Sequence, residues 1–208
     1  VYIIPLIFAI TLHEAAHAFV AHKYGDNTAK LLGRLSLNPM HHIDPFGTVV
    51  FPLISIVLGA MSGGAGFIFG WAKPVPINFS KLKSPKKDLL WIALAGPLSN
   101  LAMALIWGLL LKGTLYLDSY FGIPLGLMAQ AGISINISLL ILNLLPILPL
   151  DGGRILFSLL PVKQAQQYAQ TERYGMWILI ALLLLGGLNY IMQPLYSLLV
   201  GGIFTLLR

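Results

Sequence analysis

His13, Glu14 and His17 stand in the order H-E-x-x-H within an apolar stretch that covers residues 1–23. On a helix, residues four positions apart share a face, so both imidazoles can reach one metal ion. Glu14 follows the first histidine directly, which brings its carboxylate close enough to take a proton from a metal-bound water without binding the metal itself. Zinc suits such ligands and lowers the pKa of a bound water from about 15.7 to about 7. The spacing therefore predicts a hydrolytic zinc site with Glu14 as the base.

The apolar surroundings of this motif favour a functional role over chance. The alternative interpretation is a polar patch where helices pack and hydrogen-bond to each other. An ionisable residue at the centre of a membrane helix costs about 2.5–3.5 kcal/mol even on a lenient insertion scale. His13 lies ten residues before Lys23, so a rise of about 1.5 Å per residue puts it roughly 15 Å from that end of the helix. We therefore expect the metal to lie within the bilayer, in the half nearer to Lys23.

A catalytic zinc ion needs a third protein ligand and one open position. Asp151 is the favoured candidate, because it follows a long apolar span in "NLLPILPLDGGRIL". Prolines break the helix there, and glycines allow a close approach of the backbone. The alternative role for Asp151 is an N-cap of a helix over residues 153–160. The second candidate is His42 together with Asp44, whose alternative is a solvated loop.

Composition places the chain in a membrane. Of its 208 residues, 57% are hydrophobic and only 10% are charged, whereas a soluble domain carries about 25% charged residues. The chain therefore reads as an integral membrane protein made mostly of helices. It has no cysteine, which excludes disulfides. The net charge of +6 is explained by basic loops on one side of the membrane rather than by a nucleic-acid partner, and we expect none.

We expect an all-α, multi-pass helical bundle with about five to six membrane segments. A full span needs about 20 apolar residues, and the run at 46–61 is shorter than that. No tandem repeat or soluble appendage interrupts the chain, which predicts one domain over 1–208 with a catalytic core at 1–160 and C-terminal helices at 174–208. The expected segments are 1–23, 46–61, 89–111, 126–148, 174–192 and 194–207.

The basic residues predict the topology. If residues 46–61 enter the membrane and return to the same side, twelve basic residues lie on one face and only Lys112 lies on the other. Such a bias marks the cytoplasmic face. We therefore expect a re-entrant or extended segment near 46–79. Non-helical backbone at membrane depth is tolerated only where protein buries it or water reaches it, so a wet cavity is expected beside this segment.

Five motifs over residues 8–157 together resemble the site-2 protease family of zinc intramembrane metalloproteases, and more closely its compact bacterial branch without PDZ or CBS domains. The resemblance implies a multi-pass protein of the bacterial cell membrane that cleaves transmembrane segments of other proteins, with its active site towards the cytoplasm. It also implies one Zn²⁺ held by His13, His17 and Asp151, with Glu14 as general base and acid. The motifs are "HEAAH", "NPMHHIDPFGT", "WAKPVPIN", "AGPLSN" and "NLLPILPLDGGR".

Further roles follow from the resemblance. Asn143 matches a family asparagine that orients substrate or stabilises an oxyanion, and its alternative is an interhelical hydrogen bond. Asn100 is expected to serve packing, with Gly96 allowing close helix approach. A helical substrate must unwind before cleavage, and a strand edge could hold the unwound stretch by β-addition, using carbonyls or the N–H groups of Val75 and Ile77. The predicted edge consists of Lys73, Pro74, Val75, Pro76, Ile77 and Asn78, and its alternative is a cavity-lining loop.

Two other functions use the same residues. A non-catalytic zinc-containing scaffold that binds membrane helices would keep the ligands but would not depend on Glu14. A metal or proton transporter is the less favoured alternative, because intramembrane carboxylates and histidines also mark ion pathways. Against transport, residues 101–111 and 178–188 offer no ionisable relay to the other face. The expected partners are the lipid bilayer and a transmembrane-helix substrate; the sequence names neither that substrate nor the oligomeric state.

Overall fold

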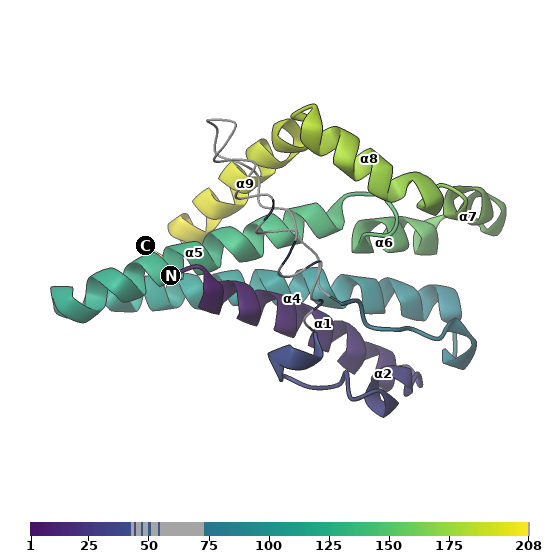
Figure 1. Cartoon of the computed structure of the whole chain (residues 1–208), viewed down its shortest axis with the longest axis horizontal. Coiled ribbons are helices and arrows are strands. Elements are labelled where there is room, and N and C mark those ends of the chain that lie inside the picture. The colour runs from purple at the N-terminus through teal and green to yellow at the C-terminus, as the bar shows by residue number, and fades with distance from the viewer. Residues whose placement is uncertain (43, 45–46, 48–49, 51–53, 55–72, 208) are drawn as a thin grey trace.

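The computed structural model describes residues 1–42, 44, 47, 50, 54 and 73–207, and all regular elements among these residues are helical (Figure 1). This confirms the expected all-α class. The α-helices are α1 (Ile3–Lys23), α2 (Thr28–Leu31), α4 (Pro85–Thr114), α5 (Ser119–Leu144), α6 (Asp151–Leu159), α7 (Val162–Ala169), α8 (Glu172–Leu184) and α9 (Gly187–Leu206), and the short 3-10 turns are η1 (Pro39–His41) and η3 (Phe79–Lys81).

Local sequence signals set the helix ends. Pro85 occupies the first turn of α4, and the Asp88 carboxylate accepts the backbone N–H of Ser84 at 2.7 Å. The Asp118 carboxylate accepts two backbone N–H groups at the start of α5. Such bonds satisfy donors that have no partner inside the helix. After α1, Gly25 adopts φ +103°, a conformation that glycine reaches without strain.

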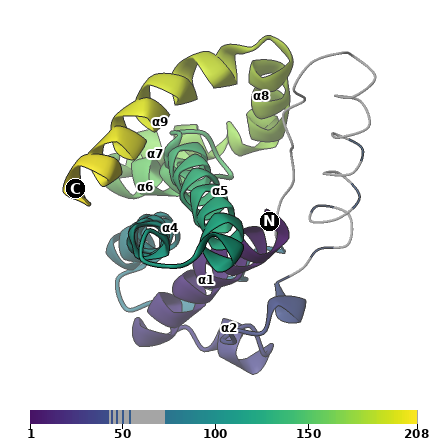
Figure 2. The ribbon, with the colours of Figure 1, turned by 90° about the vertical axis from the view of Figure 1, so that its left-hand side faces the viewer.

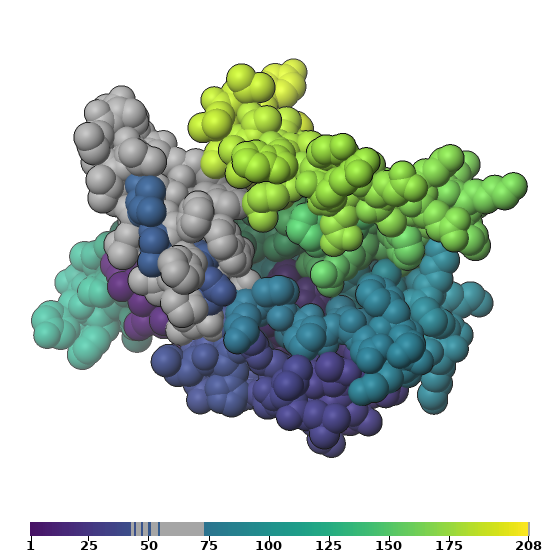
Figure 3. Space-filling model, turned by 45° about the vertical axis from the view of Figure 1, so that its right-hand side comes forward, coloured from purple at the N-terminus to yellow at the C-terminus, as the bar shows by residue number. Residues whose placement is uncertain are grey.

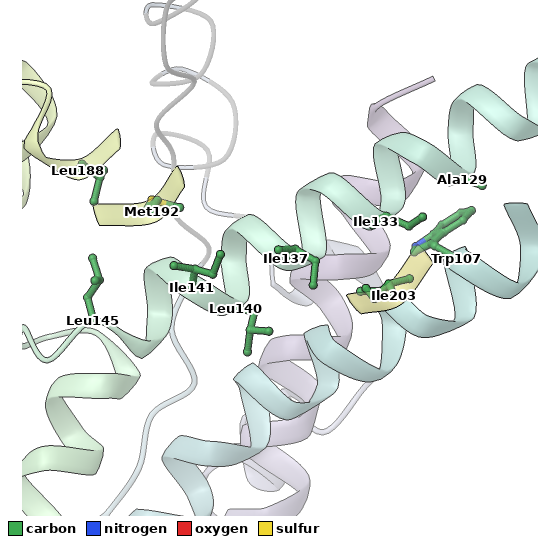
Figure 4. Close-up of a cluster of buried hydrophobic side chains, with 11 residues drawn as sticks. Trp107, Ala129, Ile133, Ile137, Leu140, Ile141, Leu145, Leu188, Met192 and Ile203 are labelled. Carbon is green, nitrogen blue, oxygen red and sulfur yellow. The ribbon is translucent and has the colours of Figure 1, made fainter. Parts of the chain in front are cut away.

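Three long helices form the centre of the molecule. In Figure 2, α1, α4 and α5 lie side by side, and α4 packs most widely against both of its neighbours. Helices α1 and α4 run antiparallel, because His17 contacts Ile92 while His13 contacts Asn100. A buried apolar cluster from α4, α5 and α9 fills the other side of α5 (Figure 4). The H-E-x-x-H motif thus packs against α4, and the apolar core fills the space between α4, α5 and α9.

Helices α1, α4 and α5 are each long and apolar enough to cross a membrane. The pair α8 and α9 passes the same test together, although the two helices meet at an angle of 80°. The described residues therefore supply three spans, or four if the bent pair counts as one. Large apolar side chains such as Leu109 and Trp177 are more than half exposed, as suits a surface in contact with lipid. The predicted segment at 46–61 lies mostly outside the described residues.

Three of the predicted segments have different boundaries in the structure. The expected span at 174–192 does not continue, because the chain breaks at Gly186, which adopts φ +72°. Helix α9 then runs through Pro194 rather than starting at it. The expected span at 126–148 starts earlier, at Ser119, and ends at Leu144, since Pro146 and Pro149 cannot continue the helix.

Residues 73–78 form neither helix nor strand, and no strand occurs in the part of the chain that is described. The non-helical character expected for "KPVPIN" is therefore confirmed for these residues. Backbone bonds fix both ends of the segment, since Lys73 donates to the carbonyl of His42 at 3.0 Å and Asn78 donates to the carboxylate of Asp26 at 2.6 Å.

Candidate metal centre

His13 and His17 project from the buried face of α1, one turn apart, as the helical period requires. Their Nε2 atoms lie 3.1 Å apart, and their rings meet edge to face. Each Nδ1 atom faces an oxygen atom of α4. Nδ1 of His17 lies 2.7 Å from the carbonyl oxygen of Ile92, and Nδ1 of His13 lies 2.6 Å from Oδ1 of Asn100. Both imidazoles therefore point their Nε2 atoms to one place.

Asp151 completes the group from the other side. It is the first residue of α6, and its Oδ2 lies 3.2 Å from Nε2 of His13 and 3.2 Å from Nε2 of His17. The alternative of an N-cap is wrong, because Leu150 holds the capping position and no side chain caps the helix. Oδ2 is buried and makes no hydrogen bond. The carboxylate therefore faces the imidazoles rather than its own helix.

The hydrogen-bond partners of these groups fit a bound cation. The oxygens of Ile92 and Asn100 can only accept, so each Nδ1 donates its ring proton to one of them, which leaves each Nε2 to offer a lone pair to a cation. Two lone pairs and a carboxylate oxygen then face one another at 3.1–3.2 Å, an arrangement that a positive ion stabilises. Tetrahedral zinc with bonds of about 2.0–2.2 Å separates its ligand atoms by about 3.3–3.6 Å. Among the described residues, these three form the one group able to hold a metal.

Gly96 leaves the space in which the imidazoles meet. A β-carbon at this position would lie 2.3 Å from Nε2 of His17 and 2.5 Å from Cε1 of His13. These rings are buried and hydrogen-bonded, so moving them aside would break the bonds that hold them. The predicted close approach of the helices at Gly96 is confirmed, and any side chain at this position would occupy the space of the two Nε2 atoms.

Backbone packing places Asp151. A β-carbon on Gly152 would lie 2.3 Å from the carbonyl oxygen of Leu144, and one on Gly153 would lie 2.5 Å from the backbone nitrogen of Leu148. Gly175 of α8 packs against the same loop, where a β-carbon would lie 1.5 Å from the carbonyl oxygen of Leu148. The loop after α5 is thus enclosed by three glycines that allow α6 and α8 to touch its backbone.

A cavity of about 370 Å³ opens onto the three ligand candidates. In Figure 3, purple atoms of α1 lie at the bottom of a hollow between green helices above and teal residues below. Glu14 lines this cavity, and its Oε2 accepts the backbone N–H of Val75 at 3.0 Å. This bond ties the carboxylate of α1 to the segment at 73–78.

Other predicted site residues divide into two groups. Asn143 lines the cavity, and its side chain makes no hydrogen bond within the described part of the chain, so the interhelical bond that was its alternative is not formed here. Of the predicted edge, Pro74, Val75 and Ile77 line the cavity. Lys73, Pro76 and Asn78 are not among the lining residues.

The second candidate ligand pair lies elsewhere. Nε2 of His42 lies 2.8 Å from the carbonyl oxygen of Ser36, and Asp44 accepts the backbone N–H of Gly47 at 2.7 Å. Neither residue belongs to the metal-capable group found among the described residues. Asp151, rather than this pair, therefore lies beside the two imidazoles.

Sequence reasoning assigned no site role to Arg154 or Asp26. Arg154 lines the cavity, and its position three residues after Asp151 on a helix was a usable signal. Asp26 is fully buried. Burial works against its ionised form, but hydrogen bonds from Thr28 and Asn78 and the charge of Lys81 outweigh burial and lower the pKa of its carboxyl below the usual value.

Comparisons with known proteins agree with this geometry. The sequence profile of Peptidase family M50 matches residues 119–186. The protein named "Putative zinc metalloprotease YwhC" of Bacillus subtilis (strain 168) is 38% identical over 202 residues, which cover 94% of this chain and 85% of that protein. The chain belongs to the site-2 protease family, Peptidase family M50. "Putative zinc metalloprotease Rip2" of Mycobacterium tuberculosis (strain H37Rv) is 30% identical over 189 residues, which cover 88% of this chain and 66% of that protein.

No solved structure matches this member of the site-2 protease family. Membership makes it a metallopeptidase, and its long apolar helices make it a multi-pass membrane protein. The compact form expected from the sequence agrees with the large share of YwhC that the chain covers. The family match at 119–186 includes Asn143 and Asp151, whereas the similarity to YwhC extends over almost the whole chain.

Proposed function

We propose that this chain is a zinc-dependent intramembrane endopeptidase, which hydrolyses peptide bonds within transmembrane segments of other membrane proteins. His13, His17 and Asp151 would hold one Zn²⁺. The observation that carries the proposal is the trio of ligand atoms at 3.1–3.2 Å from one another, in a cavity that Glu14 also lines. The names of both relatives include the words zinc metalloprotease.

The chemistry divides between the ion and the chain. Zinc in such a site activates water as a nucleophile at neutral pH and polarises a carbonyl. Glu14 takes the proton of the attacking water and passes it to the leaving amine. The N–H of Val75 binds Oε2 of Glu14, while Oε1 has no partner among the described residues. One carboxylate oxygen thus orients the group and the other carries the proton.

Residues 74–77 supply an acceptor edge for the unwound substrate. Within the described part of the chain, their carbonyl oxygens accept no hydrogen bond. Pro74 and Pro76 have no N–H, and the N–H of Val75 donates to Glu14. Among residues 74–77, the N–H of Ile77 is therefore the backbone donor that remains for a substrate. β-Addition here would therefore use mostly N–H groups of the substrate. Asn143, which lines the same cavity, would donate to a substrate carbonyl.

The active site is proposed to lie towards the cytoplasm. Because α1 and α4 are antiparallel, Lys23 at the end of α1 lies at the same end of the bundle as Lys86 and Lys87 at the start of α4. Lys112 lies at the opposite end of α4. Basic residues collect on the cytoplasmic side of membrane proteins. His13 lies at the middle of α1, and His17 lies one turn nearer to the basic end.

A cleavage assay tests the proposal. The purified chain is placed in detergent with a labelled transmembrane-helix substrate, and zinc content and cleavage are measured in parallel. Wild type is expected to hold one zinc ion and to cut. Glu14→Gln is expected to keep its zinc and to lose cleavage by about 100-fold or more, as removal of a general base does. Glu172→Gln is the matched control, because it changes an exposed glutamate, and it should cut normally.

The alternative functions give different results in this experiment. Equal cleavage by wild type and Glu14→Gln would overturn the role of Glu14 as base. Bound zinc without any cleavage by wild type would favour the scaffold. Zinc flux into liposomes that contain the wild-type chain would favour a transporter.

A further inference from the structure

Asn100 connects the metal centre to a third helix. Its side chain is fully buried on α4, and its Oδ1 lies 2.6 Å from Nδ1 of His13. Its Nδ2 donates to Oδ1 of Asn136 on α5 at 3.0 Å and also faces the carbonyl oxygen of Ala9 at 3.4 Å. Asn136, also fully buried, donates from Nδ2 to the carbonyl oxygen of Gly132 at 2.8 Å. Two amides thus join His13 to the backbone of α5.

The direction of every bond in this row follows from its last member. The carbonyl of Gly132 can only accept, so it receives the Nδ2 donor of Asn136, whose Oδ1 then faces Asn100. Asn100 must donate from its Nδ2 to this oxygen, which turns its own Oδ1 towards His13. His13 must therefore carry its proton on Nδ1. A backbone carbonyl on α5 thereby determines which nitrogen of an α1 imidazole keeps a lone pair.

We propose that Asn100 and Asn136 are positioning residues that hold His13 in the tautomer and ring orientation needed for zinc. A ligating histidine is normally fixed through its other nitrogen, and loss of that partner typically weakens metal binding 10–100-fold. His17 achieves the same through the backbone carbonyl of Ile92, which no substitution removes. The inference rests on the proposed zinc site and assigns to Asn100 a role beyond the packing that the sequence suggested.

Burial supports a polar function for this row. Both amides have no exposed surface, and they lie in the middle of helices long and apolar enough to span the membrane. A buried amide without partners costs several kcal/mol in an apolar medium. Leucine, whose side chain has the same number and branching of heavy atoms, carries no polar group and would avoid that risk. These two asparagines form a fully bonded and directional chain that ends on His13. That chain explains why polar residues occupy these positions, which packing alone does not explain.

The test measures zinc affinity by chelator competition, together with the visible spectrum of the Co²⁺-substituted protein, in detergent. Asn100→Leu is expected to lower zinc affinity 10–100-fold and to change the Co²⁺ spectrum. Asn136→Leu should have a smaller effect, because Asn100 keeps His13 but loses the partner that orients its amide. Asn100→Asp should stay within a few-fold of wild type, because a carboxylate can only accept from Nδ1 of His13. Asn189→Leu, at an exposed position of α9, is the matched control and should leave both readouts unchanged.

The outcomes distinguish the positioning role of Asn100 and Asn136 from the zinc site itself. Wild-type zinc affinity in Asn100→Leu would overturn the positioning role. An equal loss of affinity in Asn100→Asp and Asn100→Leu would also overturn it, since that pattern indicates packing. If Asn100→Leu does not fold, Asn100→Asp and Asn136→Leu still decide between the two. A wild-type chain that binds no zinc would overturn the proposed site itself.

Discussion

The imidazole side and the carboxylate side of the candidate metal centre are built by different means. His13 and His17 come from consecutive turns of one helix, and hydrogen bonds to α4 hold both rings. Asp151 follows an irregular loop, and its Oδ2 has no hydrogen bond. Glycine-mediated contacts between backbones position the carboxylate instead, through Gly152 and Gly175.

The difference indicates how each side should respond to change. Hydrogen bonds are directional, so the imidazole side should be sensitive to a change of donor or acceptor and to any group that displaces the rings. Protein interiors are closely packed and leave few voids. The carboxylate side, which backbone contacts position, should therefore be sensitive to a single added methyl group. The variants below test this contrast, beginning with the largest expected effect.

Removal of the carboxylate should have the largest effect. Asp151→Asn keeps the shape of the side chain but removes the negative charge that faces both Nε2 atoms. Zinc affinity is expected to fall by more than about 100-fold, beyond the range for outer partners of ligands. Metal analysis of the purified chain provides the measurement, with Asp118→Asn on the exposed start of α5 as control. Stoichiometric zinc in Asp151→Asn would remove the carboxylate from the ligand set.

Gly96→Ala should be the next most damaging change, and it tests the imidazole side. The new methyl group would lie 2.3 Å from Nε2 of His17, so zinc binding should fall at least about ten-fold through displaced ligands. Gly113→Ala lies on the same helix with open space around it and should bind zinc normally. Helix content should be unchanged in both, since alanine favours helices over glycine by about 1 kcal/mol. Normal zinc affinity in Gly96→Ala would mean that the rings can move aside.

Gly175→Ala tests the carboxylate side at a distance. Its methyl group would press on the carbonyl of Leu148, in the loop that precedes Asp151, and overpacking of this kind costs about 1–3 kcal/mol. We expect a lower melting temperature and zinc affinity reduced about ten-fold or less, with imidazole nitrogen NMR signals unchanged. Gly201→Ala, in open space, serves as control. A change in the imidazole signals of Gly175→Ala would mean that the two sides are coupled.

The smallest effect is expected at Asp26, which anchors residues 73–78, the segment that lines part of the cavity. Its carboxylate binds the N–H groups of Thr28 and Asn78, and hydrogen bonds to a charged group contribute about 1.5–3 kcal/mol. Because the pKa of Asp26 is lowered in the folded chain, this stabilisation is present above pH of about 4 and is lost as the pH falls further. The melting temperature of Asp26→Asn should therefore lie below that of wild type at pH 7, and the gap should narrow towards pH 3. A gap that is constant with pH would exclude ionisation as its cause.

Local patterns in the sequence were sufficient for part of this result. The H-E-x-x-H spacing brought His13 and His17 together, because the helical period is a local property. Apolar length predicted α1, α4 and α5 for the same reason. Helix ends were predicted less well, since Pro194 lies within α9 and the break occurs at Gly186. Both residues can interrupt a helix, and the packing of distant segments selects which one does.

The sequence by itself determined which groups could bind a metal and that they lie among membrane helices, because residue chemistry and helical periodicity need no knowledge of the fold. Only the tertiary structure decided which oxygen faces each Nδ1, that Gly96 borders both rings, and that Val75 holds Glu14. Those contacts join residues more than 60 positions apart. They depend on how helices pack against one another, and no local pattern records that packing.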